Sequence, residues 1–207
     1  MLAAMSEGRF TVLPDTRLSA VRGIVTTRME EAAMELAEAG FDELFDGTMR
    51  GVFNEGLLHA DAHEGTLWLL DPTRNFLVPR YNNGPNAVNF VGRFRQSLQT
   101  GMISMVVATE QPICENEVHK NTQQDPALDR KLGLVTCSML AVPLYFAGEL
   151  RGVISAVRLK PAESTKPDPA GFSPDNLRGL QLVADVLERL IEHELLTLSL
   201  GLGAGSW

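Results

Sequence analysis

The side chains best suited to metal chemistry gather in one short segment that contains His59, Asp61, His63 and Glu64. Histidine is a common metal ligand, so the cluster raises the hypothesis of a metal site. The segment lies at the predicted junction between a helix and a strand, and no cysteine or second ligand cluster accompanies it. We therefore favour the interpretation that these are solvent-exposed junction residues, and we predict no metal.

The two cysteines, Cys114 and Cys137, are the candidate nucleophiles. Both lie in or beside apolar strands, which favours two small buried thiols, with redox sensing as the alternative. The chain has no G-x-S-x-G, no phosphate-binding loop and no H-E-x-x-H. Ser138 and a histidine would still need a third group to make a nucleophilic triad. The absence of these motifs predicts a protein that is not an enzyme.

A third candidate is the aromatic and amide-rich stretch that begins at Tyr81-Asn82 and continues to Phe94. Tyr, Asn and Phe at the mouth of a sheet suit a small amphipathic ligand. Alternatively, Phe90 and Phe94, four residues apart, pack a helix onto the sheet. Both interpretations can hold together.

Charge and composition narrow the classes of partner. The 207 residues carry a net charge of −8, and 44% of them are hydrophobic. The basic residues are dispersed, which argues against a nucleic-acid partner, because phosphate binding needs a concentrated basic face. No apolar run has the roughly 18 residues of a membrane span, and no secretory leader begins the chain. With only two cysteines, we expect a reduced, cytoplasmic protein and no membrane partner.

The elements that must position these residues begin with helices. We expect a flexible arm over 1–17, a helix over 18–40 that ends at Gly40, and further helix over 41–59 at helical spacing. Strands follow at 65–71 and 76–82, joined by a turn at Asp71-Pro72. The spacing then predicts a helix over 89–101, a short helix from Met102, a short strand near Cys114 and a polar loop over 119–133.

The second half ends in a hairpin and a long helix. The run SMLAVPLYF, the turn Ala147-Gly148-Glu149 and the run LRGVISAVRL predict two antiparallel strands. Ser173 and Pro174 predict the start of a helix that continues to about Leu200, before a tail over 201–207. That helix is apolar on two sides, so one side can cover the sheet while the other needs the 18–40 helix or a second subunit.

The order of parts from Asp125 to Val157 resembles a GAF domain, a small ligand-sensing module. The resemblance covers roughly 41–196, and it is carried by these residues: Ala60-Asp61, Thr66-Leu67, Asp125-Pro126, Ser138, Pro143-Leu144, Gly152-Val153 and the FSPDNL start of the last helix. It implies an α+β fold that is GAF-like (PAS-related). In such a fold a central, mainly antiparallel sheet is flanked by helices, with long N- and C-terminal helices. The domain would span 41–200, with the 18–40 helix forming a dimer.

Departures from family subsets bear on the ligand. The cyclic-nucleotide subset carries an Asn-Lys pair where this chain has Arg158-Leu159. It also carries an acidic pair near the position where this chain has Asn176-Leu177. Bilin-binding relatives attach their chromophore through a cysteine that the segment DPALDRKLG lacks. Free methionine sulfoxide reductases of this fold need loop cysteines, and Gly101-Met102-Ile103-Ser104 has none. The resemblance therefore implies a sensor for another small molecule, and the cofactor stays unknown.

We expect the ligand to lie between the sheet and the segments 81–106 and 114–139, in a cavity of a few hundred Å3. The expected ligand-binding residues are Tyr81, Asn82, Phe90, Phe94, Met102, Ile103, Val106, Asn116, Leu128, Leu132 and Met139. The loop 119–133 would be the lid.

The function that these observations predict is regulatory. Binding of an unidentified small molecule would be transmitted through the terminal helices of a homodimer to a separate or fused output protein. The alternatives are a ligand-free dimeric protein-interaction module and, less favoured, a cyclic-nucleotide-binding domain or a thiol-dependent reductase.

Overall fold

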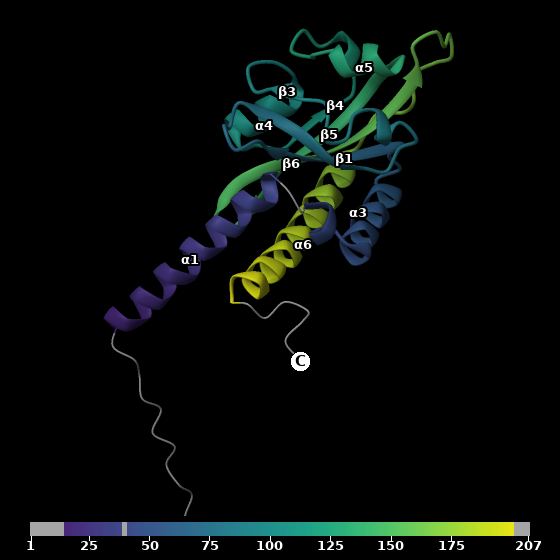
Figure 1. Cartoon of the computed structure of the whole chain (residues 1–207). Helices are drawn as coiled ribbons and strands as arrows, with labels where there is room; N and C mark the ends of the chain where they lie inside the picture. Colours follow the sequence, from purple (N-terminus) through teal and green to yellow (C-terminus); the bar gives the residue numbers. More distant parts are fainter. Residues whose placement is uncertain (1–14, 39–40, 201–207) are drawn as a thin grey trace, which may run out of the picture.

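The computed structural model describes residues 15–38 and 41–200, with a sheet between two layers of helices and loops (Figure 1). The helices are α1 (Asp15–Glu38), α2 (Phe41–Leu44), α3 (Gly47–His59), α4 (Met102–Thr109), α5 (Ala127–Leu132) and α6 (Pro174–Ser199), with short 3-10 turns η1 (Ala87–Asn89) and η2 (Val118–Lys120). The strands are β1 (Glu64–Leu70), β2 (Phe76–Asn82), β3 (Gln96–Ser97), β4 (Ile113–Glu115), β5 (Leu134–Phe146) and β6 (Glu149–Pro161). The predicted tail and most of the predicted arm lie outside the described residues.

Six strands form one sheet in the order β3-β2-β1-β6-β5-β4, and every neighbouring pair is antiparallel. The predicted hairpin is β5 and β6, which turn at Ala147-Gly148, where both residues have positive φ. Helices α1, α3 and α6 lie on one side of the sheet, and α4 and α5 lie on the other (Figure 1). The predicted α+β fold with a mainly antiparallel sheet and long terminal helices is confirmed.

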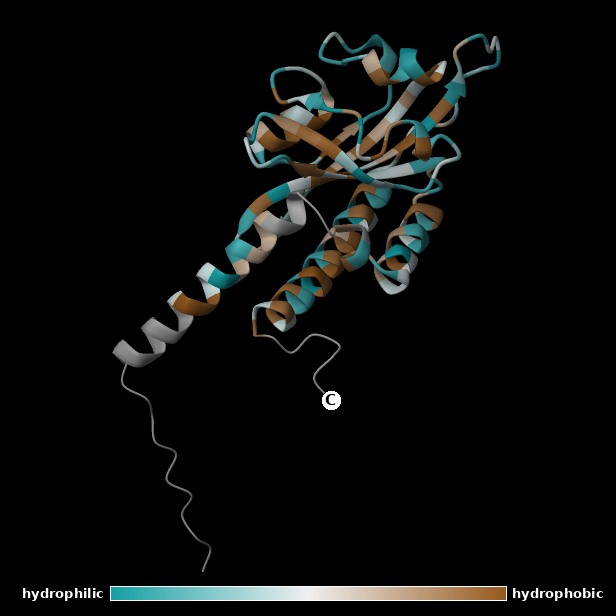
Figure 2. Ribbon diagram, in the orientation of Figure 1, coloured by the Kyte–Doolittle hydropathy of each residue, from teal (hydrophilic) through white to brown (hydrophobic). Residues whose placement is uncertain are grey.

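Strand alternation divides the buried side chains between the two faces of the sheet. Leu67 and Leu69 of β1 join Leu140 of β5 in the larger core beneath α3 and α6, whereas Trp68 and Leu70 lie in a smaller cluster on the other face. Figure 2 shows the strands mostly brown, and the loops around α5 mostly teal. The face of the sheet that α3 and α6 cover is therefore the main hydrophobic core.

Helix α6 begins where the sequence predicts. The Ser173 hydroxyl accepts a hydrogen bond from the Asn176 backbone N–H, and the Asn176 side-chain Oδ1 accepts one from the Ser173 backbone N–H, with Pro174 at the first helical position. One side of the helix is buried against the sheet through Leu180, Leu187 and Ile191. This is one of the two apolar sides expected from the sequence.

The other apolar side of α6 is partly covered within the chain. Ala33 of α1 is buried in the shared core, and Val183 of α6 packs closely on Gly56 of α3. Leu182 and Val186 remain 65% and 44% exposed. Within the described residues, no helix combines the length and apolarity needed to cross a membrane.

One predicted element is wrong. The 89–101 segment is not a helix. It follows the short turn η1 with further turns, and strand β3 within it then pairs with β2. Gly92 takes φ +71°, and its N–H bonds to Pro79 O of β2 at 2.7 Å. Arg95 also bonds to buried Asp71, which holds the segment along the edge of the sheet. Tertiary bonds thus override the local helical spacing.

Candidate functional site

A cavity of about 90 Å3 lies between the sheet and the segments that carry α4 and α5. Its lining combines apolar side chains with a band of polar ones: Glu64, Thr66, Trp68, Asn82, Phe90, Gln96, Gly101, Met102, Ile103, Gln124, Asp125, Leu128, Asp129, Leu132, Leu134, Thr136, Met139, Ser155, Val157 and Leu159. It lies where the sequence predicts a pocket, but it is smaller than the few hundred Å3 that we expected. Its size suits a compact guest.

The floor of the cavity follows from strand alternation. Glu64, Thr66 and Trp68 are every second residue of β1, and they point to the side opposite Leu67 and Leu69. Thr66 pairs with Ser155 of β6 in the antiparallel register, so the two hydroxyls lie across from each other. Two central strands therefore place polar groups in the middle of a buried face.

Hydrogen bonds fix these floor groups. The Asn82 amide Nδ2 donates to Thr66 Oγ1 at 2.9 Å and to Gly65 O at 3.0 Å. The Trp68 indole Nε1 donates to Ser155 Oγ at 2.9 Å. All four side chains are buried. The Asn82 amide and the Trp68 indole thus both donate to neighbouring groups of the floor, and these bonds hold the floor side chains in place.

Glu64 is the least satisfied of the buried polar groups in the cavity. The residue is only 9% exposed, and its one hydrogen bond within the described part of the chain is a long contact of 3.5 Å from Asn82 Nδ2. Burial raises the pKa of this carboxyl group, and the Asn82 contact and the nearby His63 only partly oppose that rise. Gly84 packs against the carboxylate so closely that a Cβ there would lie 2.1 Å from its atoms.

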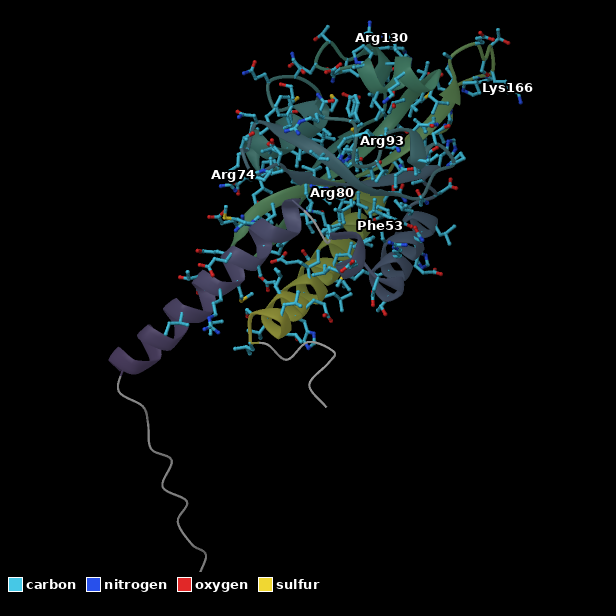
Figure 3. The ribbon with its side chains drawn as sticks, in the orientation of Figure 1. Phe53, Arg74, Arg80, Arg93, Arg130 and Lys166 are labelled. Atoms are coloured by element: carbon cyan, nitrogen blue, oxygen red, sulfur yellow. The ribbon has the colours of Figure 1, made fainter. Side chains whose placement is uncertain are left out.

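The roof comes from α4 and α5, which contribute Met102, Ile103, Leu128 and Leu132. Gly101 begins this roof with φ +92°, a conformation that favours glycine, and a Cβ there would come within 2.9 Å of the Gln96 amide. Figure 3 shows Arg130 of α5 on this side of the sheet and Phe53 of α3 on the other. The roof is thus soft and apolar above a polar floor.

Asp125 fastens the start of α5 to the rest of the cavity wall. Its carboxylate accepts bonds from Gln96 Nε2 at 3.2 Å, Thr100 Oγ1 at 3.1 Å and the Ala127 N–H at 3.0 Å. Burial alone would raise the pKa of Asp125, but these donors and the charge of Arg130 outweigh it and lower the pKa. Asp125 is therefore an ionised anchor.

Asp129 fastens the middle of α5 to the start of β5. Its two carboxylate oxygens accept bonds from Thr136 Oγ1 and Thr136 N–H, both at 2.8 Å. Gln124 Nε2 adds a third donor at 2.9 Å. The loop over the cavity is consequently tied to β5 through one side chain.

Seven of the predicted ligand residues line this cavity: Asn82, Phe90, Met102, Ile103, Leu128, Leu132 and Met139. Four do not, and strand or helix periodicity explains Tyr81 and Val106. Tyr81 is next to Asn82 on β2, so it points to the other face, where its ring packs on Phe45 and Phe53. Val106, one helical turn beyond Ile103, is buried against the sheet, and Phe94 packs edge-on to Trp68.

Asn116 is the fourth predicted ligand residue that does not line the cavity. Its side chain bonds to the backbone of Phe172, with Nδ2 donating to Phe172 O at 3.0 Å and Oδ1 accepting from Phe172 N–H at 2.7 Å. It thus ties the segment after β4 to the residue just before the Ser173 cap of α6. This bond joins segments 56 residues apart, so no local pattern predicts it.

Most of the polar floor was missed at the sequence level, because Glu64 was considered only as part of a junction. Glu64, Thr66 and Trp68 alternate with glycine and leucine, and this period-two signal could have identified a polar strip on β1. The contribution of Ser155 and Thr136 depends on the pairing register of β5 and β6. The sequence alone does not supply that register.

The junction cluster does not assemble around a shared centre. His63 Nδ1 accepts the Leu159 N–H at 2.9 Å, while Asp61 pairs with Arg158 at 3.3 Å. Glu64 points into the cavity instead. In the described part of the chain, three potential ligands do meet elsewhere, at His119, Cys137 and Asp168, where Lys160 already pairs with Asp168.

Wider hollows also lie on the described surface, and one of about 510 Å3 lies beside the β5–β6 turn. It is lined in part by charged side chains such as Arg74 and Glu149, which pair with each other at 3.3 Å. Another, of about 220 Å3, lies between α1 and the β1–β2 turn. The cavity at Glu64 differs because most of its polar lining is buried, so we take it as the candidate site.

Comparison of the sequence with profiles of known families assigns the chain to a family. Residues 38–192 match the sequence profile described as the GAF domain. The chain belongs to the GAF domain family. A search of curated proteins finds no match to this GAF domain.

Solved structures resemble this GAF domain at low sequence identity. The GAF domain of an Acinetobacter phosphoenolpyruvate-protein phosphotransferase has a TM-score of 0.57 and 18% identity, covering 91% of this chain and 99% of that one. The corresponding Coxiella burnetii domain gives 0.58 and 17%, with 86% and 98% covered. A free methionine-R-sulfoxide reductase from Neisseria meningitidis, in complex with its substrate, gives 0.53 and 16%, with 88% and 95% covered. Thus the fold is shared by regulatory domains and by enzymes.

The thiols of this GAF domain lie away from the cavity lining. The prediction of two buried thiols is confirmed for Cys137, which is 1% exposed, but is wrong for Cys114, which is exposed on the edge strand β4. Burial raises the pKa of Cys137, and partial burial together with the charge of Glu115 raises the pKa of Cys114. Both groups therefore favour the protonated thiol, which is the less nucleophilic form.

Arg158 stands where the cyclic-nucleotide subset would carry its signature, and it is used structurally. Its guanidinium bonds to four backbone carbonyls at 2.6–3.2 Å, those of Ala60, Asp61, Ala170 and Gly171, and it stacks 4.3 Å from the Phe172 ring centroid. On β6 it alternates with the cavity residues Val157 and Leu159. Arg158 thus holds the ends of α3 and α6 together on the helix side.

Proposed function

We propose that this GAF domain is a regulatory sensor that binds a compact small molecule in the cavity between the sheet and α4–α5. The observation that carries the proposal is the buried polar floor beneath an apolar roof, since concave sites of this kind suit small ligands with few polar groups. The predicted loop 119–133 is its lid, because Asp125 and Asp129, in the middle of the loop, tie it to the cavity wall and to β5 by bonds that a guest would strengthen or compete with.

The same proposal assigns the signal to α6. Asn116 links the segment that leads into the lid directly to Phe172, at the start of α6. A change in lid position would pull on this link and shift the helix. The output is a partner or a fused domain that contacts the terminal helices.

A ligand screen on a blocked variant tests the pocket. Val157→Trp fills the cavity from β6, and Val88→Trp is the matched control, because Val88 is 71% exposed on the surface. In thermal-shift measurements against a metabolite panel, ligands of the site should stabilise the wild type and Val88→Trp but not Val157→Trp. Equal stabilisation of both variants, or no ligand at all, would support the ligand-free interaction module instead.

We also propose that the domain is a homodimer joined through its terminal helices. The support is the exposed apolar strip formed by Leu182 and Val186 on α6, with Ile24 and Met34 exposed on α1. Light scattering should give about twice 22.6 kDa, and the double variant Leu182→Glu with Val186→Glu should give a monomer. Ile191 is unsuitable as a probe, because it is fully buried within the chain itself. A wild-type monomer would refute the dimer but leave the pocket untouched.

A further inference from the structure

The cavity of the proposed sensor has an uneven charge balance. Its lining contains the carboxylates of Glu64, Asp125 and Asp129 and, among the described residues, no Lys, Arg or His. Phosphate and carboxylate ligands usually meet a basic side chain or a helix N-terminus. A ligand with a negative charge would lie near these three carboxylates, and no basic side chain of the lining would offset their repulsion, so the charge of the lining disfavours it.

Of these three acids, two are already used by the protein. Asp125 and Asp129 each accept three hydrogen bonds from neighbouring groups of the wall and lid. Glu64 is different, because the residue is nine-tenths buried and its one partner among the described residues lies 3.5 Å away. A buried carboxylate without good partners is costly unless something supplies donors to it. It therefore points to a ligand that donates hydrogen bonds.

We propose that the ligand is a small organic cation, a protonated amine with a short apolar body, and that Glu64 is its counter-ion. This proposal rests on the pocket function above and names its ligand class. The ammonium group lies against Glu64 on the polar floor, and the apolar body lies beneath Met102, Ile103 and Leu128. Trp68, fixed by its bond to Ser155, adds aromatic surface that attracts a cation. The volume of about 90 Å3 restricts the body to a few heavy atoms.

Three small probes with four carbon atoms each test the charge preference: n-butylamine, 1-butanol and butyrate. Binding at neutral pH is followed by NMR, through the Trp68 indole N–H and the methyl groups of Met102 and Met139. The amine should bind at least tenfold more tightly than butyrate, in the range on the order of 10 mM that suits fragments of this size. Glu64→Gln should reduce the preference to less than about threefold.

Glu188→Gln is the matched control, because Glu188 is a half-buried acid with a pKa raised by burial, and it lies on α6 outside the cavity. It should keep the tenfold preference. Gly84→Ala is a second probe, since its Cβ would displace the Glu64 carboxylate, and it should weaken the amine while leaving butanol unchanged. Thermal melts confirm that each variant is folded.

The outcomes separate the two proposals. Stronger shifts with butyrate or butanol at the same methyl groups would overturn the cationic ligand and keep the pocket. Absence of any amine response would also overturn it, and the Val157→Trp screen would then decide the pocket independently. A preference retained in Glu64→Gln would mean that Glu64 is not the counter-ion.

Discussion

The two faces of the sheet use the same strands for opposite purposes. On the helix side, alternate residues such as Leu140 and Ile154 are fully buried and packed under α3 and α6. On the other side, their neighbours Met139 and Ser155 border an empty space roofed by α4 and α5. One face therefore stabilises the domain, and the other gives up some packing and buries polar groups to keep a cavity. Four predictions test this division.

The largest effect is expected from adjacent residues of β5. Leu140→Ala should cost about 2–5 kcal/mol in the free energy of unfolding, because it opens a new void in the filled core. Met139→Ala should cost less than about 1 kcal/mol, because it only enlarges an existing cavity. Urea denaturation of both variants measures the difference. Equal losses would mean that the cavity face is packed as tightly as the core.

Asp129→Ala should loosen the lid without unfolding the domain. The substitution removes three hydrogen bonds to a carboxylate. Hydrogen bonds to charged groups each contribute about 1.5–3 kcal/mol to stability, and water that takes their place in the variant reduces the net loss. Hydrogen exchange should speed up at the Thr136 amide and in α5 but not in α6. Glu163→Ala, at an exposed position, is the control. Uniform acceleration across the domain would contradict a local role.

Glu64→Gln should stabilise the protein at neutral pH by about 1 kcal/mol, or roughly 2–4 °C in Tm. Burial raises the folded-state pKa of Glu64 above its unfolded value, so the ionised carboxylate opposes folding at pH values above the folded pKa. As the pH falls through the folded pKa toward the usual carboxyl range, the wild type recovers this loss. The advantage of the variant should therefore shrink in acid. A destabilised variant at pH 7 would show that the protein itself satisfies Glu64.

The smallest effect is expected from the thiol outside the cavity. Cys114→Ser should change stability by no more than about 0.5 kcal/mol and leave ligand-induced stabilisation unchanged, because Cys114 is exposed and makes only a weak contact of 3.8 Å to Phe172 O. Calorimetric titration and a methionine sulfoxide reduction assay measure both properties. Thiol-dependent reduction by the wild type would revive the reductase alternative.

Local sequence patterns determined the elements and the family. The β5–β6 hairpin, the Ser173 cap and the two-sided α6 follow from short-range rules, because their turn, cap and periodic signals lie within a few residues of each other. The family resemblance rests on the order of these same parts. Seven cavity residues could be predicted in this way, although one of them, Phe90, lies in the 89–101 segment that is not the expected helix.

The tertiary structure alone decided which side chains meet. Tyr81 and Asn82 are adjacent in the sequence, yet only the pairing of β2 with β1 decides which of them points to the cavity and which to Phe45 and Phe53. The 89–101 segment does not form the expected helix, because it bonds instead to β2 and to Asp71, which are distant from it in the sequence. Glu64 became the candidate ligand group because the register of three strands and the roof of two helices bury it. That burial depends on long-range packing, which no local pattern of residues encodes.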